Sequence, residues 1–94
     1  MKYSISTRRS SDNFHTTFEV NGEAEMHNRL QFEVNRMKEE LPIGETGEIW
    51  VNCYKFCNCP YNENGYGWVI LRHYHYLDDG SMKKEEYKDG KLYY

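Results

Sequence analysis

The sequence lacks three features that would place it in a large functional class. It has no apolar run of membrane-spanning length, and residues 1–13, MKYSISTRRSSDN, lack the apolar segment that a signal peptide needs. Its formal net charge is −3, so it also lacks the basic excess with which proteins bind long nucleic acid. We therefore expect a cytoplasmic protein that binds neither a membrane nor long nucleic acid.

Cysteine is scarce, with only Cys53, Cys57 and Cys59 in the chain. An odd number in a cytoplasmic protein predicts reduced thiols rather than a disulfide framework. Structural zinc needs four nitrogen or sulfur ligands, each ~2.0–2.3 Å from the ion. In the hairpin that we expect over residues 48–77, Cys57 lies near the loop, about six residues or roughly 20 Å along the strands from His73. We therefore expect no metal site and no cofactor, and the reactivity of Cys57 and Cys59 stays open.

The sequence also lacks a complete set of catalytic groups. Its acidic pairs, at 39–40, 78–79 and 85–86, are adjacent residues, whose side chains diverge on a helix or a strand. The glycine-containing segment NENGYG lacks the spacing of a phosphate loop and the helix that should follow one. A cysteine–histidine pair is disfavoured because Cys53 and His73 are expected on the buried face of the sheet. We therefore expect a protein that is not an enzyme.

Alternating apolar and polar residues predict two strands at the start of the chain. Residues 3–7 and 14–20 alternate with the period of a strand, and the polar segment RRSSDN between them has the composition of a loop. The 94 residues suit a single domain, 1–94, with one modest core.

One amphipathic helix follows the predicted hairpin. It begins at a plausible N-cap, Asn21, and ends at Pro42. Five apolar side chains form a narrow stripe along it: Met26, Leu30, Val34, Met37 and Leu41. Phe32 falls outside this stripe, so we expect another segment to cover it or a partner to contact it.

The second half of the chain has the pattern of a β-meander. Residues 48–57 and 67–77 are rich in aromatic and β-branched residues, as expected of two long strands. The Asp-Gly pairs at 79–80 and 89–90 are turn signals and predict two further short strands. The predicted fold class is α+β: one amphipathic helix packed on one face of an antiparallel sheet of five or six strands, in the order hairpin, helix, β-meander.

A register for the two long strands assigns their faces. The predicted cross-strand pairs are Phe56 with Trp68, Tyr54 with Ile70, Asn52 with Arg72, and Trp50 with Tyr74. The face under the helix then carries Ile49, Val51, Cys53, Val69, Leu71, Leu77, His73 and His75. The opposite face carries Trp50, Asn52, Tyr54, Phe56, Trp68, Arg72, Tyr74 and Tyr76. A slip of one residue would reverse these faces.

Aromatic residues make up 16% of the chain, and a core of this size cannot hold all of them. Since one helix covers one side of a sheet, we expect the ring-rich face to be a surface that binds another protein. Aromatic side chains and arginine dominate the binding energy of protein interfaces. The predicted binding residues are Trp50, Asn52, Tyr54, Phe56, Trp68, Arg72, Tyr74, Tyr76 and Phe32.

Three alternatives stay open. The amino-terminal hairpin could fold over this face, leaving no recognition surface. The chain could be a small-ligand or nucleotide-binding module whose rings stack on a base while Arg72, Lys55 or Arg8 holds phosphate. It could also be a structural homo-oligomer, such as a homodimer, joined through the rings, through Phe32 or through the edge strands.

A very small, acidic, ring-rich single domain without a catalytic set is similar in general character to accessory proteins of phages and mobile elements. Inhibitors of host defence, such as anti-CRISPR proteins, belong to that group. This likeness implies an inhibitor that binds a bacterial defence effector or another host protein.

Overall fold

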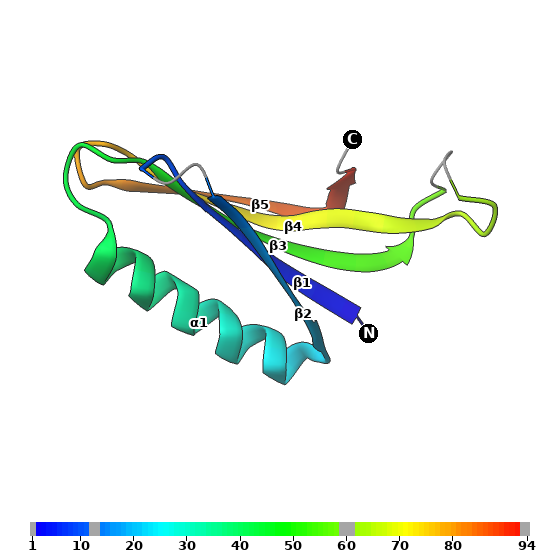
Figure 1. The fold of residues 1–94 in the computed structure, drawn as a ribbon. Coiled ribbons are helices and arrows are strands. Elements are labelled where there is room, and N and C mark those ends of the chain that lie inside the picture. The colour runs from blue at the N-terminus through cyan, green and yellow to red at the C-terminus, as the bar shows by residue number, and fades with distance from the viewer. Residues whose placement is uncertain (1, 12–13, 59–61, 93–94) are drawn as a thin grey trace.

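Among the described residues, five antiparallel strands form one sheet, and a single helix lies across one of its faces (Figure 1). The computed structural model describes residues 2–11, 14–58 and 62–92. The elements are β1 (Lys2–Arg9), β2 (Phe14–Asn21), α1 (Glu23–Glu40), β3 (Gly47–Phe56), β4 (Tyr66–Tyr76) and β5 (Met82–Leu92). The strand order is β2-β1-β3-β4-β5, so the predicted α+β class is confirmed, with five strands in the sheet.

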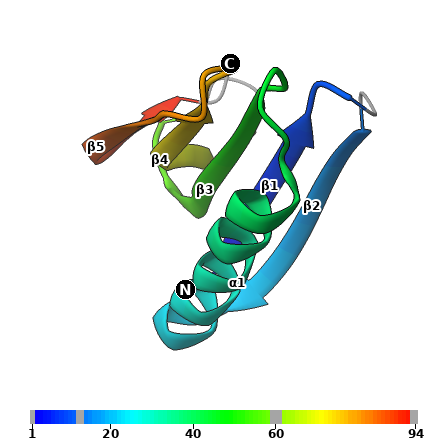
Figure 2. The same ribbon diagram turned by 90° about the vertical axis from the view of Figure 1, so that its left-hand side faces the viewer.

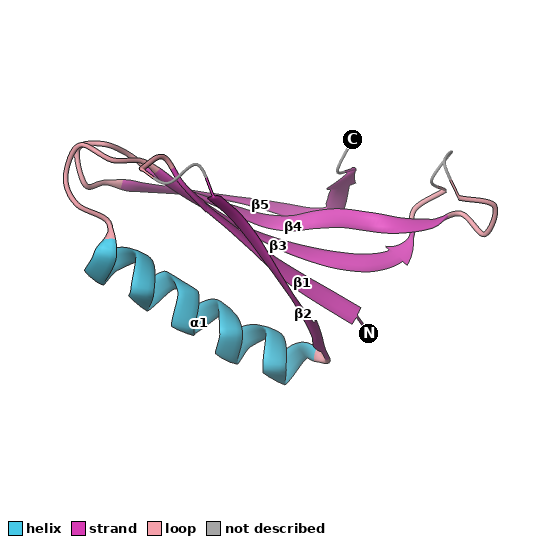
Figure 3. Cartoon of the chain, in the orientation of Figure 1, coloured by secondary structure: helices cyan, strands magenta, loops and turns pink. Residues whose placement is uncertain are grey.

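The connection through α1 sets the two layers of the fold (Figure 3). The chain leaves the β1–β2 hairpin, crosses one face of the sheet as α1, and returns as β3 on the other side of β1. Contacts of α1 reach β1, β2 and β3. Figure 2 shows β4 and β5 extending away from α1, so the helix covers one half of one face.

The helix ends where the sequence predicts, but its N-cap lies one residue after the predicted one. Asn21 is the last residue of β2, and Gly22 takes the N-cap position with a φ of 93°. Only glycine adopts this backbone conformation without strain, so Gly22 makes the sharp change from strand to helix. At the other end, Leu41 is extended because Pro42 follows it.

The predicted apolar stripe of α1 forms the core against the sheet. Met26, Leu30 and Met37 are buried, and the partly buried Val34 and Leu41 pack against the same cluster. Their partners in the sheet are Ile5, Ile49, Val51, Tyr74 and Tyr76. Removing these apolar surfaces from water is the main stabilising contribution that the helix makes.

The predicted pairing of the two long strands is wrong. Tyr54 pairs with Trp68, whereas Trp50 pairs with His73, because the register shifts between Val51 and Asn52. Leu71 is the extra residue on β4 at this point, so β4 bulges and the side chains beyond it reach the opposite face.

Because of the bulge, the side chains of β4 beyond Leu71 lie on the opposite face of the sheet from the one predicted. Tyr74 and Tyr76 lie in the core under the helix, with 7% and 6% of their surfaces exposed. His73 and His75, which the predicted register placed under the helix, lie on the other side of the sheet beside Trp50. A bulge in a ring-rich strand leaves no clear mark in its hydrophobic pattern, which is why the predicted register missed it.

The two Asp-Gly pairs have different structures. Gly80, with a φ of 89°, lies in the turn between β4 and β5, as predicted. The second pair makes no turn, because β5 runs on as one strand to Leu92, so the prediction of two short strands is wrong. Gly90 has a φ of 84°, and a Cβ there would lie 2.6 Å from Val69 Cγ2. Gly90 therefore marks an irregularity in a continuous strand that passes close to Val69.

Candidate functional site

The sheet face opposite α1 collects rings and polar groups along its length; we call it the open face. Residues directly opposite one another in neighbouring strands point to the same side of the sheet. Ser4, Asn52 and Ile70 form one such row across β1, β3 and β4, and Ser6, Trp50 and His73 form the next. No described helix lies on this side (Figure 1).

Four rings gather at the end of the open face nearest the β3–β4 loop. This aromatic cluster consists of Tyr54, Phe56, Tyr66 and Trp68. The ring centroids of Tyr54 lie 5.8 Å from Tyr66 and 5.4 Å from Trp68, and those of Phe56 and Tyr66 are 5.9 Å apart. Phe56 is 59% exposed and Tyr66 is 42% exposed, so the cluster presents apolar surface to solvent.

A polar hollow lies beside the aromatic cluster, at the centre of the open face; we call it the central hollow. Its volume is about 170 Å³, and its lining consists of Ser4, Ser6, Thr17, Glu19, Asn52 and Trp68. The buried Asn52 amide nitrogen donates hydrogen bonds to both serine hydroxyls, at 3.2 and 3.3 Å. The amide oxygen of the same side chain is buried without a hydrogen-bond partner among the described residues. The central hollow therefore holds an acceptor that is ready for a donor.

The far end of the open face carries histidines and carboxylates. His73 stacks on Trp50 with 4.8 Å between ring centroids, and His73 Nε2 lies 2.8 Å from Glu48 Oε2. His75 lies beside His73, with 3.7 Å between their centroids, and His75 Nε2 is 2.9 Å from Glu85 Oε1. We call Glu48, His73 and His75 the histidine cluster. These groups could hold a metal ion, since one ligand atom from each lies within 4.8 Å of the others.

Glu85 borders the histidine cluster from β5. A hydrogen bond from the Tyr87 hydroxyl, followed by the interaction with His75, lowers the pKa of the Glu85 carboxyl below its ordinary value. Glu85 is therefore held as a carboxylate at neutral pH, next to the imidazoles.

The structure brings five of the nine predicted binding residues together. Those on the open face are Trp50, Asn52, Tyr54, Phe56 and Trp68. The predicted placement on this face is wrong for Arg72, which pairs with the buried Val51, and for Tyr74 and Tyr76, which lie in the core. Burial raises the pKa of the Tyr76 phenol, as expected for a hydroxyl shielded from water.

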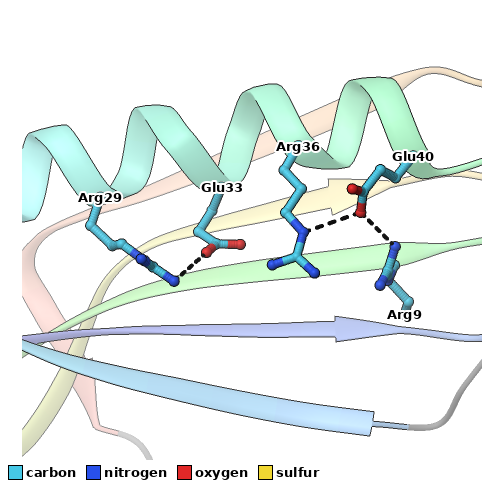
Figure 4. Close-up of polar contacts among 5 residues, drawn as sticks. All are labelled: Arg9, Arg29, Glu33, Arg36 and Glu40. Carbon is cyan, nitrogen blue, oxygen red and sulfur yellow. Dashed lines mark hydrogen bonds and ion pairs between the residues drawn. The ribbon is translucent and has the colours of Figure 1, made fainter.

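Phe32 is exposed but belongs to the helix, on the opposite side of the sheet from the open face. It takes part in a group of charged and aromatic side chains between α1 and β2. The Arg29 guanidinium lies 3.7 Å from the centroid of Phe18 and 5.1 Å from that of Phe32. The same arginine lies 3.0 Å from the buried carboxylate of Glu33 (Figure 4). Phe32 thus supports the position of Arg29, which neutralises a buried charge.

A second charged group lies near the end of α1, where Glu40 contacts both Arg36 and Arg9 (Figure 4). This pairing links the helix to β1. Of the ion pairs drawn in Figure 4, Arg29–Glu33 and Arg36–Glu40 lie within α1, and Arg9–Glu40 joins α1 to β1.

The three cations predicted to hold phosphate do not converge. Arg8 lies across from Glu48, Arg72 is on the helix side, and the Lys55 ammonium donates to the backbone oxygen of Asp89. The structure therefore offers a nucleotide no common phosphate site built from these residues.

Sequence reasoning missed Tyr66, the two serines of the central hollow and the histidine cluster. The spacing of His73 and His75 was a usable signal, because residues two apart on a strand share a face. Glu48 could not be paired with them without the true register. Cys59 lies outside the described residues, and Cys57 is a half-buried free thiol.

Within residues 2–11, 14–58 and 62–92, no helix combines the length and apolar character needed to cross a membrane. No protein-family model matches the chain, and neither a curated protein nor a solved structure matches it.

Proposed function

We propose that this protein is a non-catalytic binding domain, and that its open face holds a segment of another protein. The partner inserts one hydrogen-bond-donating side chain into the central hollow, and its neighbouring residues contact the aromatic cluster. The observation that carries this proposal is the buried, unpaired amide oxygen of Asn52, in a hollow walled by Trp68.

The size of the central hollow favours a single side chain over a whole small molecule. Its volume of about 170 Å³ is below the range of roughly 300–1,000 Å³ in which most small-molecule sites fall. Exposed rings continue beyond it at Phe56 and Tyr66. A surface with one small hollow and flanking rings resembles the centre of a protein interface, where an anchor side chain enters a pocket.

The chemistry of the hollow defines the donor. The amide oxygen of Asn52 accepts a hydrogen bond, and the carboxylate of Glu19 supplies negative charge at the rim. Glu19 is only loosely paired, because Lys2 Nζ lies 3.6 Å from its Oε2 and both side chains are about half exposed. A lysine or arginine of the partner can therefore displace Lys2 and donate to both groups.

The proposed partner is a bacterial defence protein or another host protein, met in the cytoplasm, and the chain acts as its inhibitor. This part of the proposal is based on the small size, the acidic charge and the ring content of the chain. An acidic protein that binds through a negative hollow requires a partner with a basic surface at the contact.

The test begins with capture of a host protein on the immobilised chain, its identification and its purification. The dissociation constant is then measured by calorimetry for the wild type and for Trp68→Ala, Phe56→Ala and Glu19→Gln. We expect Trp68→Ala to weaken binding at least ~30-fold, as for a central anchor residue, and the other two at least ~5-fold. Phe32→Ala is the matched control, because Phe32 is as exposed as Phe56 but lies on the helix side.

Equal affinities for the wild type and all three open-face variants would overturn the proposal, as would a loss of affinity confined to Phe32→Ala. Two other results would replace it. A concentration-dependent dimer that Trp68→Ala dissociates would make the open face a self-association surface. A thermal shift with a nucleotide that Trp68→Ala abolishes would make the chain a ligand-binding module.

A further inference from the structure

The histidine cluster has the composition of a transition-metal site and lies apart from the central hollow. Two imidazoles and a carboxylate are the ligand set that leaves one position of a tetrahedral zinc ion open. Glu48 pairs directly with His75 across β3 and β4, and the bulge at Leu71 places His73 on the same face. Within the described part of the chain, this is the one group of three or more such side chains with converging ligand atoms.

We propose that Glu48, His73 and His75 bind one divalent transition-metal ion, with zinc as the preferred metal. The ligand atoms are one ring nitrogen of each imidazole and one carboxylate oxygen. Ligands ~2.0–2.2 Å from a tetrahedral ion are separated by about 3.4 Å. The three atoms lie within 4.8 Å of one another, with the His73–Glu48 pair at 2.8 Å. Rotations that move side-chain tips by about an ångström therefore suffice to enclose the ion.

His75 adds a second acidic neighbour to the proposed site. Its Nε2 atom is buried and lies 2.9 Å from Glu85 Oε1, without a well-aligned hydrogen bond among the described residues. Because a metal-binding imidazole must be neutral, coordination through this nitrogen requires His75 to exchange the Glu85 contact for the ion. The divalent charge also compensates the carboxylates of Glu48 and Glu85, which lie on either side of the imidazoles.

The surroundings supply the support that metal ligands need. Trp50 stacks on His73 and fixes the plane of its ring. Glu85 Oε1 on β5 lies 2.9 Å from His75 Nε2, at the edge of the cluster. Two exposed cations flank the cluster in the strand pairing, with Arg8 opposite Glu48 and Lys83 opposite His75.

Metal binding at the histidine cluster can be followed by the fluorescence of Trp50. The chain has two tryptophans, and Trp68 lies outside the cluster. In a Trp68→Phe background, Co²⁺ should quench the fluorescence of Trp50 with a saturable one-to-one dependence and should show the visible absorption of a four-coordinate ion. Zn²⁺ should reverse the quenching by displacing Co²⁺, and calorimetry should give a stoichiometry of one.

His75→Gln and Glu48→Gln are the decisive variants, since each removes one proposed ligand and keeps both residues of the Trp50–His73 stack. Each should weaken Zn²⁺ binding at least ~10-fold. His27→Gln is the control, because His27 lies on α1, far from the cluster. A Cys57→Ser, Cys59→Ser double variant should bind Zn²⁺ as the wild type does. Circular dichroism confirms that each variant is folded.

The proposal is overturned if Zn²⁺ binding survives both ligand variants, or if it disappears in the cysteine variant, which would place the metal at the thiols. Absence of binding in the wild type would overturn it as well. None of these results bears on capture of a protein partner through Trp68.

Discussion

The two faces of the sheet contain the same kinds of ring in opposite situations. Under α1, Tyr74 and Tyr76 are almost fully buried, whereas on the open face Phe56 and Tyr66 expose about half of their surfaces. The aromatic content of a strand therefore does not indicate whether it forms core or recognition surface. One inserted residue, Leu71, and the path of one helix decide which rings are covered.

Buried polar atoms without a well-aligned hydrogen bond occur on both faces of the described sheet. On the helix side, Glu33 Oε1 and Arg29 Nε belong to one ion pair, and the Tyr76 hydroxyl is enclosed in the core. On the open face, His75 Nε2 has Glu85 Oε1 2.9 Å away, whereas the Asn52 oxygen has no hydrogen-bond partner among the described residues and borders a hollow. The difference is access, because a partner can reach the Asn52 oxygen through the central hollow.

The largest expected difference between the two sides is in stability. Leu30→Ala removes a buried side chain from the core and should lower the free energy of unfolding by about 2–5 kcal/mol. Phe32→Ala, two residues away on the same helix, removes a half-exposed ring and should cost less than about 1 kcal/mol. Denaturation in urea measures both. Similar losses for the two variants would contradict the orientation of α1 described above.

A smaller effect, with a defined pH dependence, is expected at Tyr76. Its hydroxyl is buried without a hydrogen-bond partner among the described residues, so Tyr76→Phe should leave stability unchanged or raise it by up to about 1 kcal/mol. Burial raises the pKa of Tyr76 in the folded state, so the unfolded chain gives up the phenol proton first. Ionisation of Tyr76 therefore leaves stability unaffected below the unfolded-state pKa of ~10 and lowers it as the pH rises through the folded value.

Thermal unfolding of both proteins between neutral pH and ~pH 11 measures this contribution. The wild type should lose more stability than Tyr76→Phe above ~pH 10. Parallel loss in the two proteins would contradict the burial of the Tyr76 hydroxyl in the core.

The sequence predicted the parts of the fold that depend on local pattern. The α1 stripe from Met26 to Leu41 follows the helical period, and Pro42 ends the helix, so both could be predicted without knowing the tertiary structure. The first hairpin was predicted by its alternation and its polar loop. The N-cap was misplaced by one residue because a glycine with positive φ performs the change from strand to helix at Gly22.

Features that depend on pairing between distant strands could not be predicted. The bulge at Leu71 changes which face His73 and Tyr74 occupy, and a strand rich in rings on both faces has no pattern that reveals it. Asp89-Gly90 is a dipeptide that usually indicates a turn, but here it lies within β5, and Gly90 passes close to Val69. The open face was therefore predicted correctly along β3, where no residue is inserted, and incorrectly along the second half of β4.

Oxidative footprinting of the aromatic side chains tests the division between the two faces most directly. In the free chain, hydroxyl radicals should label Phe56 and Tyr66 rapidly and Tyr74 and Tyr76 slowly. In complex with the purified partner, Phe56, Tyr66 and Trp68 should become protected while labelling of Phe32 stays unchanged. Rapid labelling of Tyr74 and Tyr76 in the free chain would contradict their burial under α1. Protection confined to Phe32 in the complex would contradict binding through the open face.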